Sequence, residues 1–287
     1  MPEIDDCSVH LMLTSPPYPM VQMWDAQFCK IDERIAQLWK KLSVLTDDDV
    51  VGKIYNLMHK SLAKTWQETF RVLVEGGIAA INIGDATRRL DNKFQLFPNH
   101  SRIIEVCEKI GFITLPYILW KKPTTKPHYK GKGAFLGSGF LPPNAYVTLD
   151  CEFILLFRKG RLRKFPCNDH VRYESKFTKA QRDEWFSQIW TLNGIRQNES
   201  EFERRTAAYP NEIAERLIKM FSIKGDTILD PFLGSGTTMK TANSIQRNCI
   251  GYEVEENLLP IIQKNVNKNH NKPQTTMPVE IHIIKRR

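Results

Sequence analysis

The stretch DTILDPFLGSGTT, residues 226–238, decides the fold class of this 287-residue chain. It predicts a short apolar strand that ends at Asp230, then a glycine turn and the start of a helix. A second strand, residues 248–253, follows and ends on Glu253. This order predicts a βαβ nucleotide-binding unit, because glycines let the backbone approach a ligand and a carboxylate can bind both hydroxyls of a ribose.

The glycine turn also has a rival interpretation, a nicotinamide-binding Rossmann unit. That pattern, GxGxxG, needs a third glycine, and Met239 stands in its place. Phe232 beside the turn suits an apolar or sulfonium-bearing group better than a pyrophosphate. A purely structural turn is the less favoured alternative.

A second motif, TSPPY at residues 14–18, follows the apolar run of residues 8–13. Two consecutive prolines fix φ near −65° and remove two backbone donors. Such a turn can hold a planar group against the Tyr18 ring while Ser15 and the Pro16 carbonyl accept hydrogen bonds from an amino group. Taken alone, the five residues are better explained by a stiff loop after a strand than by an active site.

The rest of the chain alternates between expected helices and strands, as in α/β folds. We expect Gly76-Gly77 to end the second helix. Asp85 follows a strand as the TSPPY motif does, so it is either a second polar tip at the same cleft or a surface turn carboxylate. Residues 19–30 form either a mobile loop at the site or an ordinary packing segment. The expected helices are 31–42, 48–74, 101–110, 211–221 and 239–245, and the expected strands are 8–13, 78–83, 113–120, 151–158, 226–230 and 248–253.

Positive charge is concentrated in residues 121–182, which hold fourteen Lys and Arg but four Asp and Glu. The whole chain has a net charge of +9, so the remainder is close to neutral. A localised basic segment with interleaved aromatic side chains predicts contact with nucleic acid, and a solvated basic loop is the alternative. The candidate DNA-binding cations are Lys121, Lys122, Lys126, Lys130, Lys132, Arg161, Arg163 and Lys164.

Taken together, the two motifs resemble the β-class amino-methyltransferases of DNA, in which the catalytic motif precedes the cofactor motif. Supporting matches are the segments GGIAAINIGD (76–85), LWKKP (119–123) and EFILLFRK (152–159), and Tyr209-Pro210 before the last helix. The resemblance covers nearly the whole chain. It implies a Rossmann-like methyltransferase fold, α/β, circularly permuted, with a mixed, mostly parallel sheet, helices on both faces and a small DNA-recognition insert.

The resemblance also implies roles for particular residues. Ser15, Pro16, Pro17 and Tyr18 would hold a flipped base of double-stranded DNA, and family members with Ser before Pro-Pro-Tyr mostly methylate the N4 amino group of cytosine. The cofactor would be S-adenosyl-L-methionine, with Glu253 on its ribose and Tyr209-Pro210 beside its methionine end. The cofactor-binding candidates are Asp230, Phe232, Gly234, Ser235, Gly236, Thr237, Glu253, Tyr209 and Pro210.

By this resemblance, residues 1–158 form the catalytic half, with a basic loop at 121–150. Residues 159–205 form the target-recognition insert and residues 206–287 the cofactor-binding half. The family usually has one more strand before the catalytic turn, and the run 279–284 is a candidate to replace it. The family also often has His-Pro-Ala before the Tyr-Pro pair, where this chain has Arg205-Thr206-Ala207-Ala208.

Composition excludes other classes. No apolar run is long enough to cross a membrane, and the acidic N-terminus has no hydrophobic signal core, so we expect a cytoplasmic, nucleoid-associated protein. Six cysteines without a CxxC pair predict neither a metal site nor disulfides. Cys167 could serve carbon-5 methylation of cytosine, but it has no supporting motif.

Three alternatives in function stay open at this point. The same turn could serve an adenine-N6 methyltransferase, and related turns hold planar amides in RNA or protein substrates. A non-enzymatic DNA-binding protein could keep the fold, although the intact Gly234, Gly236 and Glu253 argue against it. A cognate restriction endonuclease acting on the same DNA site is a possible partner.

Overall fold

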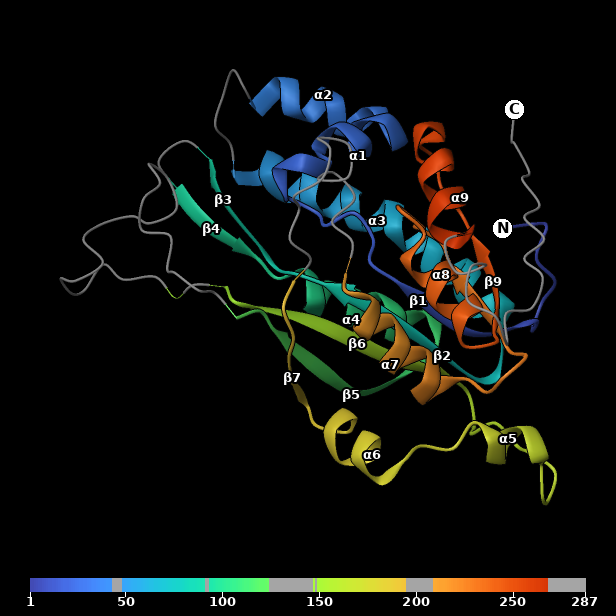
Figure 1. The fold of residues 1–287 in the computed structure, drawn as a ribbon. Helices are drawn as coiled ribbons and strands as arrows, with labels where there is room; N and C mark the ends of the chain where they lie inside the picture. Colours follow the sequence, from blue (N-terminus) through green and yellow to red (C-terminus); the bar gives the residue numbers. More distant parts are fainter. Residues whose placement is uncertain (43–47, 91–92, 124–146, 148, 195–208, 268–287) are drawn as a thin grey trace.

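The computed structural model describes residues 1–42, 48–90, 93–123, 147, 149–194 and 209–267. Its main feature is a sheet of order β7-β5-β6-β2-β1-β8-β9, with β3 and β4 as a separate hairpin (Figure 1). The strands are β1 (Val9–Thr14), β2 (Leu73–Ile83), β3 (Ala86–Leu90), β4 (Lys93–Phe97), β5 (Phe112–Lys121), β6 (Cys151–Lys159), β7 (Ile189–Thr191), β8 (Thr227–Asp230) and β9 (Asn248–Gly251).

The sheet is mostly parallel, as predicted. β1 pairs in parallel with both β2 and β8, and β8 pairs in parallel with β9. β6 is antiparallel to β2 and β5, while β7 is parallel to β5. The carboxyl ends of the six parallel strands therefore lie at one edge of the sheet, which we call the catalytic edge; the other edge is the opposite edge.

Helices cover both faces of the sheet, because the central strands are apolar on both sides. On one face, Met12 and Ile81 pack with the side chains of α3 and α4. On the other face, Leu11 and Leu13 pack with α7. The helices are α1 (Asp25–Ile31), α2 (Glu33–Leu42), α3 (Asp48–Val72), α4 (Asn99–Ile110), α5 (His170–Glu174), α6 (Lys179–Trp185), α7 (Asn211–Phe221), α8 (Thr237–Ser244) and α9 (Leu259–Asn267), with short 3₁₀ turns at Gln22–Trp24 and Glu256–Leu258.

The TSPPY motif, residues 14–18, is called the catalytic turn below, after the role that the family resemblance implies. The segment that follows it, residues 19–30, packs into the core. Residues 22–31 form a 3₁₀ turn and α1, and Met20 and Phe28 are buried in the core. Arg88 of β3 holds this segment through two hydrogen bonds to Asp25. The chain after the catalytic turn is therefore anchored to β3 at the first residue of α1.

The expected helix stop at Gly76-Gly77 is wrong. Helix α3 ends at Val72, and both glycines lie inside the longer strand β2. Gly76 has a φ of +79°, and a Cβ there would come within 2.2 Å of the Arg163 backbone nitrogen. A close approach of the chain after β6 therefore requires glycine. Gly111, in contrast, does end α4, in the left-handed conformation.

The segment 159–194, the described part of the expected insert, contains regular secondary structure. It contains α5 and α6, and β7 extends the main sheet beside β5. Trp185 and Trp190 pack in the same core cluster as α7. The described part of this segment is therefore integrated into the fold. The candidate replacement strand, residues 279–284, lies outside the described residues.

Candidate active site

Three neighbouring strands, β2, β1 and β8, bring both predicted motifs to the catalytic edge. Thr14, the last residue of β1, donates a hydrogen bond of 2.6 Å from Oγ1 to Asp230 Oδ1 at the end of β8. Residues 216 positions apart are thus in direct contact. The sequence predicted both motifs, and the parallel pairing of β1 with β8 is what joins them.

Asp230 is buried, with 2% of its surface exposed, and it is bonded to several neighbouring groups. Its carboxylate accepts hydrogen bonds from the hydroxyls of Thr14 and Thr238 and from the Phe232 backbone N–H. Burial raises the pKa of Asp230 to about 6; those three hydrogen bonds lower it, and the charge of Glu253 raises it further. No ion pair neutralises this carboxylate among the described residues.

The glycine turn has the left-handed conformations that glycine favours, with φ of +54° at Gly234 and +86° at Gly236. Glu253 closes the turn, since its Oε2 accepts a 2.8 Å hydrogen bond from the Gly234 N–H. Its Oε1 accepts from the Glu255 N–H at 2.8 Å. Burial raises the pKa of Glu253, and within the described parts of the chain this carboxylate also lacks an ion pair.

Ser235 and Thr237 lie on the two sides of Gly236, and helix α8 begins at Thr237. The predicted Tyr209 is buried, and its hydroxyl is hydrogen-bonded to Thr238 Oγ1 beside Asp230. Pro210 precedes the first residue of α7. The structure thus brings all of the predicted cofactor-binding residues to the region around the glycine turn.

The catalytic turn is held by a hydrogen-bond network. Ser15 Oγ lies 3.1 Å from the Tyr18 hydroxyl, which donates to Glu152 Oε2 at 2.9 Å. Asn82 Nδ2, near the end of β2, donates to the same hydroxyl at 2.8 Å and to Glu152 Oε2 at 2.7 Å. Lys122 forms an ion pair with Glu152 Oε1.

Asn82 and Glu152 were not predicted as site residues, although both lie in segments that carry the family resemblance. Their position at strand ends was the available signal. Gly84 packs against the Tyr18 ring, since a Cβ at this position would come 3.0 Å from Cε2 of that ring. Asn99 ties the two chain segments together by donating to the carbonyls of Pro19 and Gly84.

Asp85 lies beside this network but faces helix α4. It accepts hydrogen bonds from the backbone N–H of His100 at 3.1 Å and is 2.8 Å from His100 Nδ1. The His100 ring stacks on Phe153 with centroids 4.0 Å apart. The structure thus places Asp85 at the converging strand ends, the first of the two interpretations. There it anchors α4 through its hydrogen bonds with His100.

The predicted basic residues are split between the two edges. Lys121 ends β5 at the catalytic edge, and Lys122 bonds Glu152 there. Lys126, Lys130 and Lys132 lie outside the described residues. Strand β6 then carries the chain about 30 Å across the sheet, so Arg161, Arg163 and Lys164 lie at the opposite edge, where they line a cavity with His10 and Glu75.

Arg163 is committed to an ion pair at that opposite edge. Its guanidinium donates to both oxygens of Asp226 at 2.6 and 2.9 Å, and it stacks over Phe165. The structure therefore does not bring Arg161, Arg163 and Lys164 to the catalytic turn.

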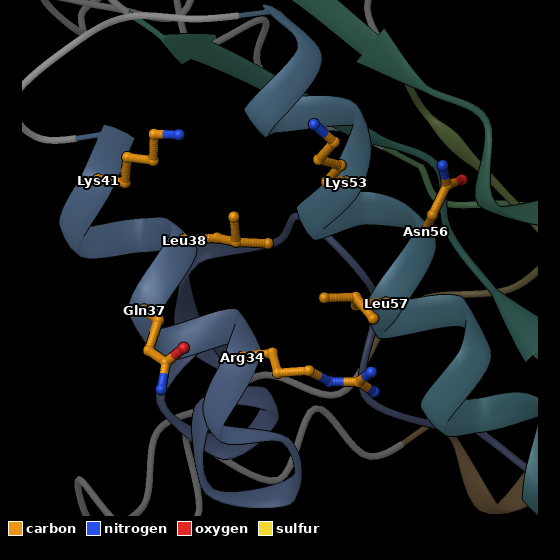
Figure 2. A pocket seen from close by; sticks show the side chains of 7 residues that line it. All are labelled: Arg34, Gln37, Leu38, Lys41, Lys53, Asn56 and Leu57. Carbon is orange, nitrogen blue, oxygen red and sulfur yellow. The ribbon is translucent and has the colours of Figure 1, made fainter.

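A separate groove of about 560 Å³ lies between α2 and α3. Figure 2 shows its polar side chains, among them Arg34 and Lys53, around Leu38 and Leu57. Arg34 is bonded to Asp32 through Nε and Nη2. The groove contains none of the predicted site residues, so the strand ends remain the candidate site.

Comparison with known proteins agrees with the fold and the site. The family described as DNA methylase matches residues 9–264. The Type II methyltransferase M.MjaI of Methanocaldococcus jannaschii is 58% identical over 93% of this chain and 88% of its own length. M.MthZI of Methanothermobacter thermautotrophicus is 44% identical over 100% and 77%. The structure of a DNA modification methylase from Thermus thermophilus, in complex with S-adenosyl-L-methionine, has a TM-score of 0.71 at 27% identity and covers 96% of this chain and 92% of that one.

The fold and the two joined strand-end motifs define a Rossmann-like methyltransferase. The chain belongs to the DNA methylase family of N6 and N4 methyltransferases. It is a DNA methyltransferase whose methyl donor is S-adenosyl-L-methionine. The nicotinamide interpretation of the glycine turn is thereby excluded.

The site fits this cofactor on its own chemistry. Gly234 and Gly236 hold the turn in left-handed conformations, and Glu253 presents a carboxylate bonded to the Gly234 N–H. Asp230 and Glu253 concentrate negative charge at a place where the described residues supply no cation, which suits a ligand with a sulfonium and an ammonium group. Among the described residues there is no cluster suited to a metal ion, and no helix is long and apolar enough to cross a membrane.

Proposed function

We propose that this chain methylates the exocyclic N4 amino group of cytosine in double-stranded DNA. The observation that carries the proposal is Ser15 at the first position of the turn, within hydrogen-bond reach of Tyr18. Serine at this position is typical of the cytosine-N4 members of the family that the motifs resemble. Adenine-N6 methylation uses the same turn and is the alternative outcome of the test.

The residues of the turn suit a direct transfer without a covalent enzyme intermediate. The cofactor supplies an activated methyl group on its sulfonium. Ser15 Oγ and the Pro16 carbonyl accept the two amino hydrogens of the base and hold its nitrogen in line for attack. A base inside a duplex cannot reach this turn, so it must be flipped, and stacking on Tyr18 returns about 1–3 kcal/mol of that cost.

We infer that the duplex lies along the catalytic edge. Lys121 lies at this edge. The Lys122 N–H donates to Asp150 O, and the Leu192 N–H donates to Lys121 O. The described residues on either side of 124–146, and those that precede 195–208, therefore lie at the same edge. Target recognition is assigned to the insert, residues 159–205, and the basic loop, residues 121–150, is assigned to contact with the DNA. Because the named relatives are Type II methyltransferases, we infer a cognate restriction endonuclease with the same DNA site as a partner.

Product analysis tests the assignment of the base. The protein is incubated with DNA and isotopically labelled cofactor, and the methylated nucleoside is identified by mass spectrometry. N4-methylcytosine is expected, whereas N6-methyladenine would replace the proposal by its alternative. DNA methylated in this way is then challenged with a panel of Type II endonucleases, and protection from one of them identifies the shared recognition site.

Two variants test the catalytic turn. Ser15→Ala and Tyr18→Ala are expected to abolish transfer while the dissociation constant for the cofactor stays close to the wild-type value. The matched control is Ser61→Ala, which removes a hydroxyl that donates to the Leu57 carbonyl on α3. Wild-type transfer in either turn variant would refute the assignment of these residues.

A further inference from the structure

The hydroxyl of Tyr18 is the centre of the network at the catalytic turn. Three polar groups surround it: Glu152 Oε2 at 2.9 Å, Asn82 Nδ2 at 2.8 Å and Ser15 Oγ at 3.1 Å. A phenol oxygen has one hydrogen to donate and two lone pairs to accept. Each of the three neighbours therefore has to use a different position on that oxygen.

The first two positions are fixed by chemistry. Glu152 is a carboxylate and can only accept, so it takes the Tyr18 hydrogen. Asn82 Nδ2 is a donor and occupies one lone pair. Only the second lone pair is left for Ser15, so the Ser15 hydroxyl must point its hydrogen at Tyr18.

The orientation of Asn82 is itself fixed by Glu152. Its Nδ2 donates to both Tyr18 and Glu152 Oε2, and the flipped amide would place its oxygen against the carboxylate. Asn82 is 1% exposed, and its Oδ1 has no hydrogen-bond partner within the described part of the chain. An unpaired buried acceptor is costly, so this orientation is maintained at the expense of stability.

The charge balance of the network keeps the hydrogens in these places. Lys122 pairs with the second oxygen of Glu152, which leaves Oε2 for Tyr18 and Asn82. Burial, and next the charge of Glu152, raises the pKa of Tyr18 well above 10, so the phenol keeps the hydrogen that it donates.

We propose that Asn82, Tyr18 and Glu152 form a hydrogen-bond relay that makes Ser15 Oγ a pure acceptor for the amino group of the target base. Serine can donate or accept, and only an accepting oxygen can bind an amino hydrogen. Asn82 and Glu152 are thus positioning residues, which act through Tyr18 and Ser15. The relay rests on the proposed amino-group methylation and holds for either cytosine or adenine, since both present an amino group.

The first test replaces Glu152 by Gln. An amide has one acceptor oxygen, and Lys122 and the Tyr18–Asn82 pair compete for it, so the relay is broken or reversed. We expect the single-turnover methylation rate at saturating DNA and cofactor to fall about tenfold to a hundredfold. Cofactor affinity and the thermal midpoint should stay unchanged. The matched control is Glu108→Gln, a carboxylate bonded to Thr114 towards the opposite edge.

A rescue separates the relay from a merely structural role. In the double variant Lys122→Met with Glu152→Gln, no ammonium competes for the amide oxygen, which can again accept from Tyr18 and Asn82. Most of the lost rate should return, again at saturating DNA so that any effect of Lys122 on DNA affinity is removed. A double variant as slow as Glu152→Gln alone would overturn the relay.

The second test removes only the hydroxyl, by Tyr18→Phe, which leaves the ring for packing. The rate should fall by a similar factor, and adding Glu152→Gln to this background should slow transfer no further, because the two changes break the same path. A wild-type rate in Tyr18→Phe, or additive losses, would overturn the relay. An adenine product with these same rates would instead refute only the choice of base.

Discussion

The two ends of strand β8 each hold a buried aspartate, and the two carboxylates are satisfied in opposite ways. Asp226, at the opposite edge, is 4% exposed and bound by the Arg163 guanidinium at 2.6 and 2.9 Å. Asp230, at the catalytic edge, is 2% exposed and bound by two threonine hydroxyls and a backbone N–H. A cation neutralises the first, while the described residues provide none for the second.

This difference shows where the fold gains stability and where it keeps binding capacity. A buried carboxylate without a cation is unfavourable for the protein alone, which is why burial raises the pKa of Asp230. The same unneutralised charge favours a cationic ligand. At the opposite edge the buried carboxylate is neutralised within the fold, whereas we propose that the unneutralised carboxylate at the catalytic edge attracts the cationic groups of the cofactor.

Removing the neutralised carboxylate should have the largest effect. Asp226→Ala leaves Arg163 without its partner and also removes the acceptor of the Ile223 N–H. We expect the free energy of unfolding to fall by about 3 kcal/mol, measured by urea denaturation. The methylation rate per folded molecule should not change. An equal loss of stability in Asp230→Asn would erase the contrast between the two edges.

Two glycines of the β2 segment sharpen the same contrast. Gly76→Ala places a Cβ 2.2 Å from the Arg163 backbone at a φ of +79°, and we expect it to cost about 2 kcal/mol of stability or more. Gly84→Ala places a Cβ 3.0 Å from the Tyr18 ring, so we expect about a tenfold slower transfer with little change in stability.

The control for both glycine variants is Gly52→Ala in helix α3, where the new Cβ meets no described residue within 4 Å apart from its chain neighbours and the backbone of its own helix. It should be neutral or slightly stabilising, because alanine favours a helix. Denaturation midpoints and single-turnover rates of the three variants provide the comparison. If Gly84→Ala lost as much stability as Gly76→Ala, in addition to slower transfer, the two edges would not differ in the way proposed.

Removing the charge at the catalytic edge should act on binding. Asp230→Asn keeps a polar group near Thr14 and Thr238 but removes the negative charge. Because the cofactor carries positive charge, we expect its dissociation constant to rise about tenfold, measured by titration calorimetry. Stability at neutral pH should be maintained or increased, because the substitution removes a buried charge that no cation neutralises within the described residues. Unchanged affinity would show that this carboxylate only supports the turn.

The smallest effect is a pH dependence that separates the two edges. Asp230 has a folded pKa of about 6, above its unfolded value of 3.8. Its native state binds the proton more tightly, so the stability from this group is present at low pH and lost as pH rises through 6. Cofactor affinity should change in the opposite direction, increasing by up to about tenfold from pH 5 to pH 7. The increase in affinity should be much smaller in Asp230→Asn.

The basic segment shows that residues close together in the sequence can lie far apart in the structure. Residues 121–182 form one charged stretch in the sequence. In the structure, β6 crosses the whole sheet within that stretch, so Lys122 and Arg163 lie at different edges. The number of charges in a stretch of sequence does not say where those charges lie, whereas an extended strand places the residues at its two ends far apart.

The catalytic network shows a second limit. Ser15 and Tyr18 were predicted because they share one short motif, and the glycine turn because its strand, turn and acid are local. Asn82 and Glu152 come from two other strands, and their roles arise only from the parallel pairing of β1 with β2 and the antiparallel pairing of β2 with β6. Local patterns do not specify such pairings.

The sequence by itself determined the α/β class, the order of the two motifs and the residues of each motif, because prolines, glycines and apolar periodicity act through the local backbone. Tertiary structure alone decided that Thr14 meets Asp230, that Glu152 and Asn82 orient Tyr18, and that Arg163 serves Asp226. Those contacts depend on which strands are neighbours and on which edge each strand ends, and packing of the whole sheet sets both.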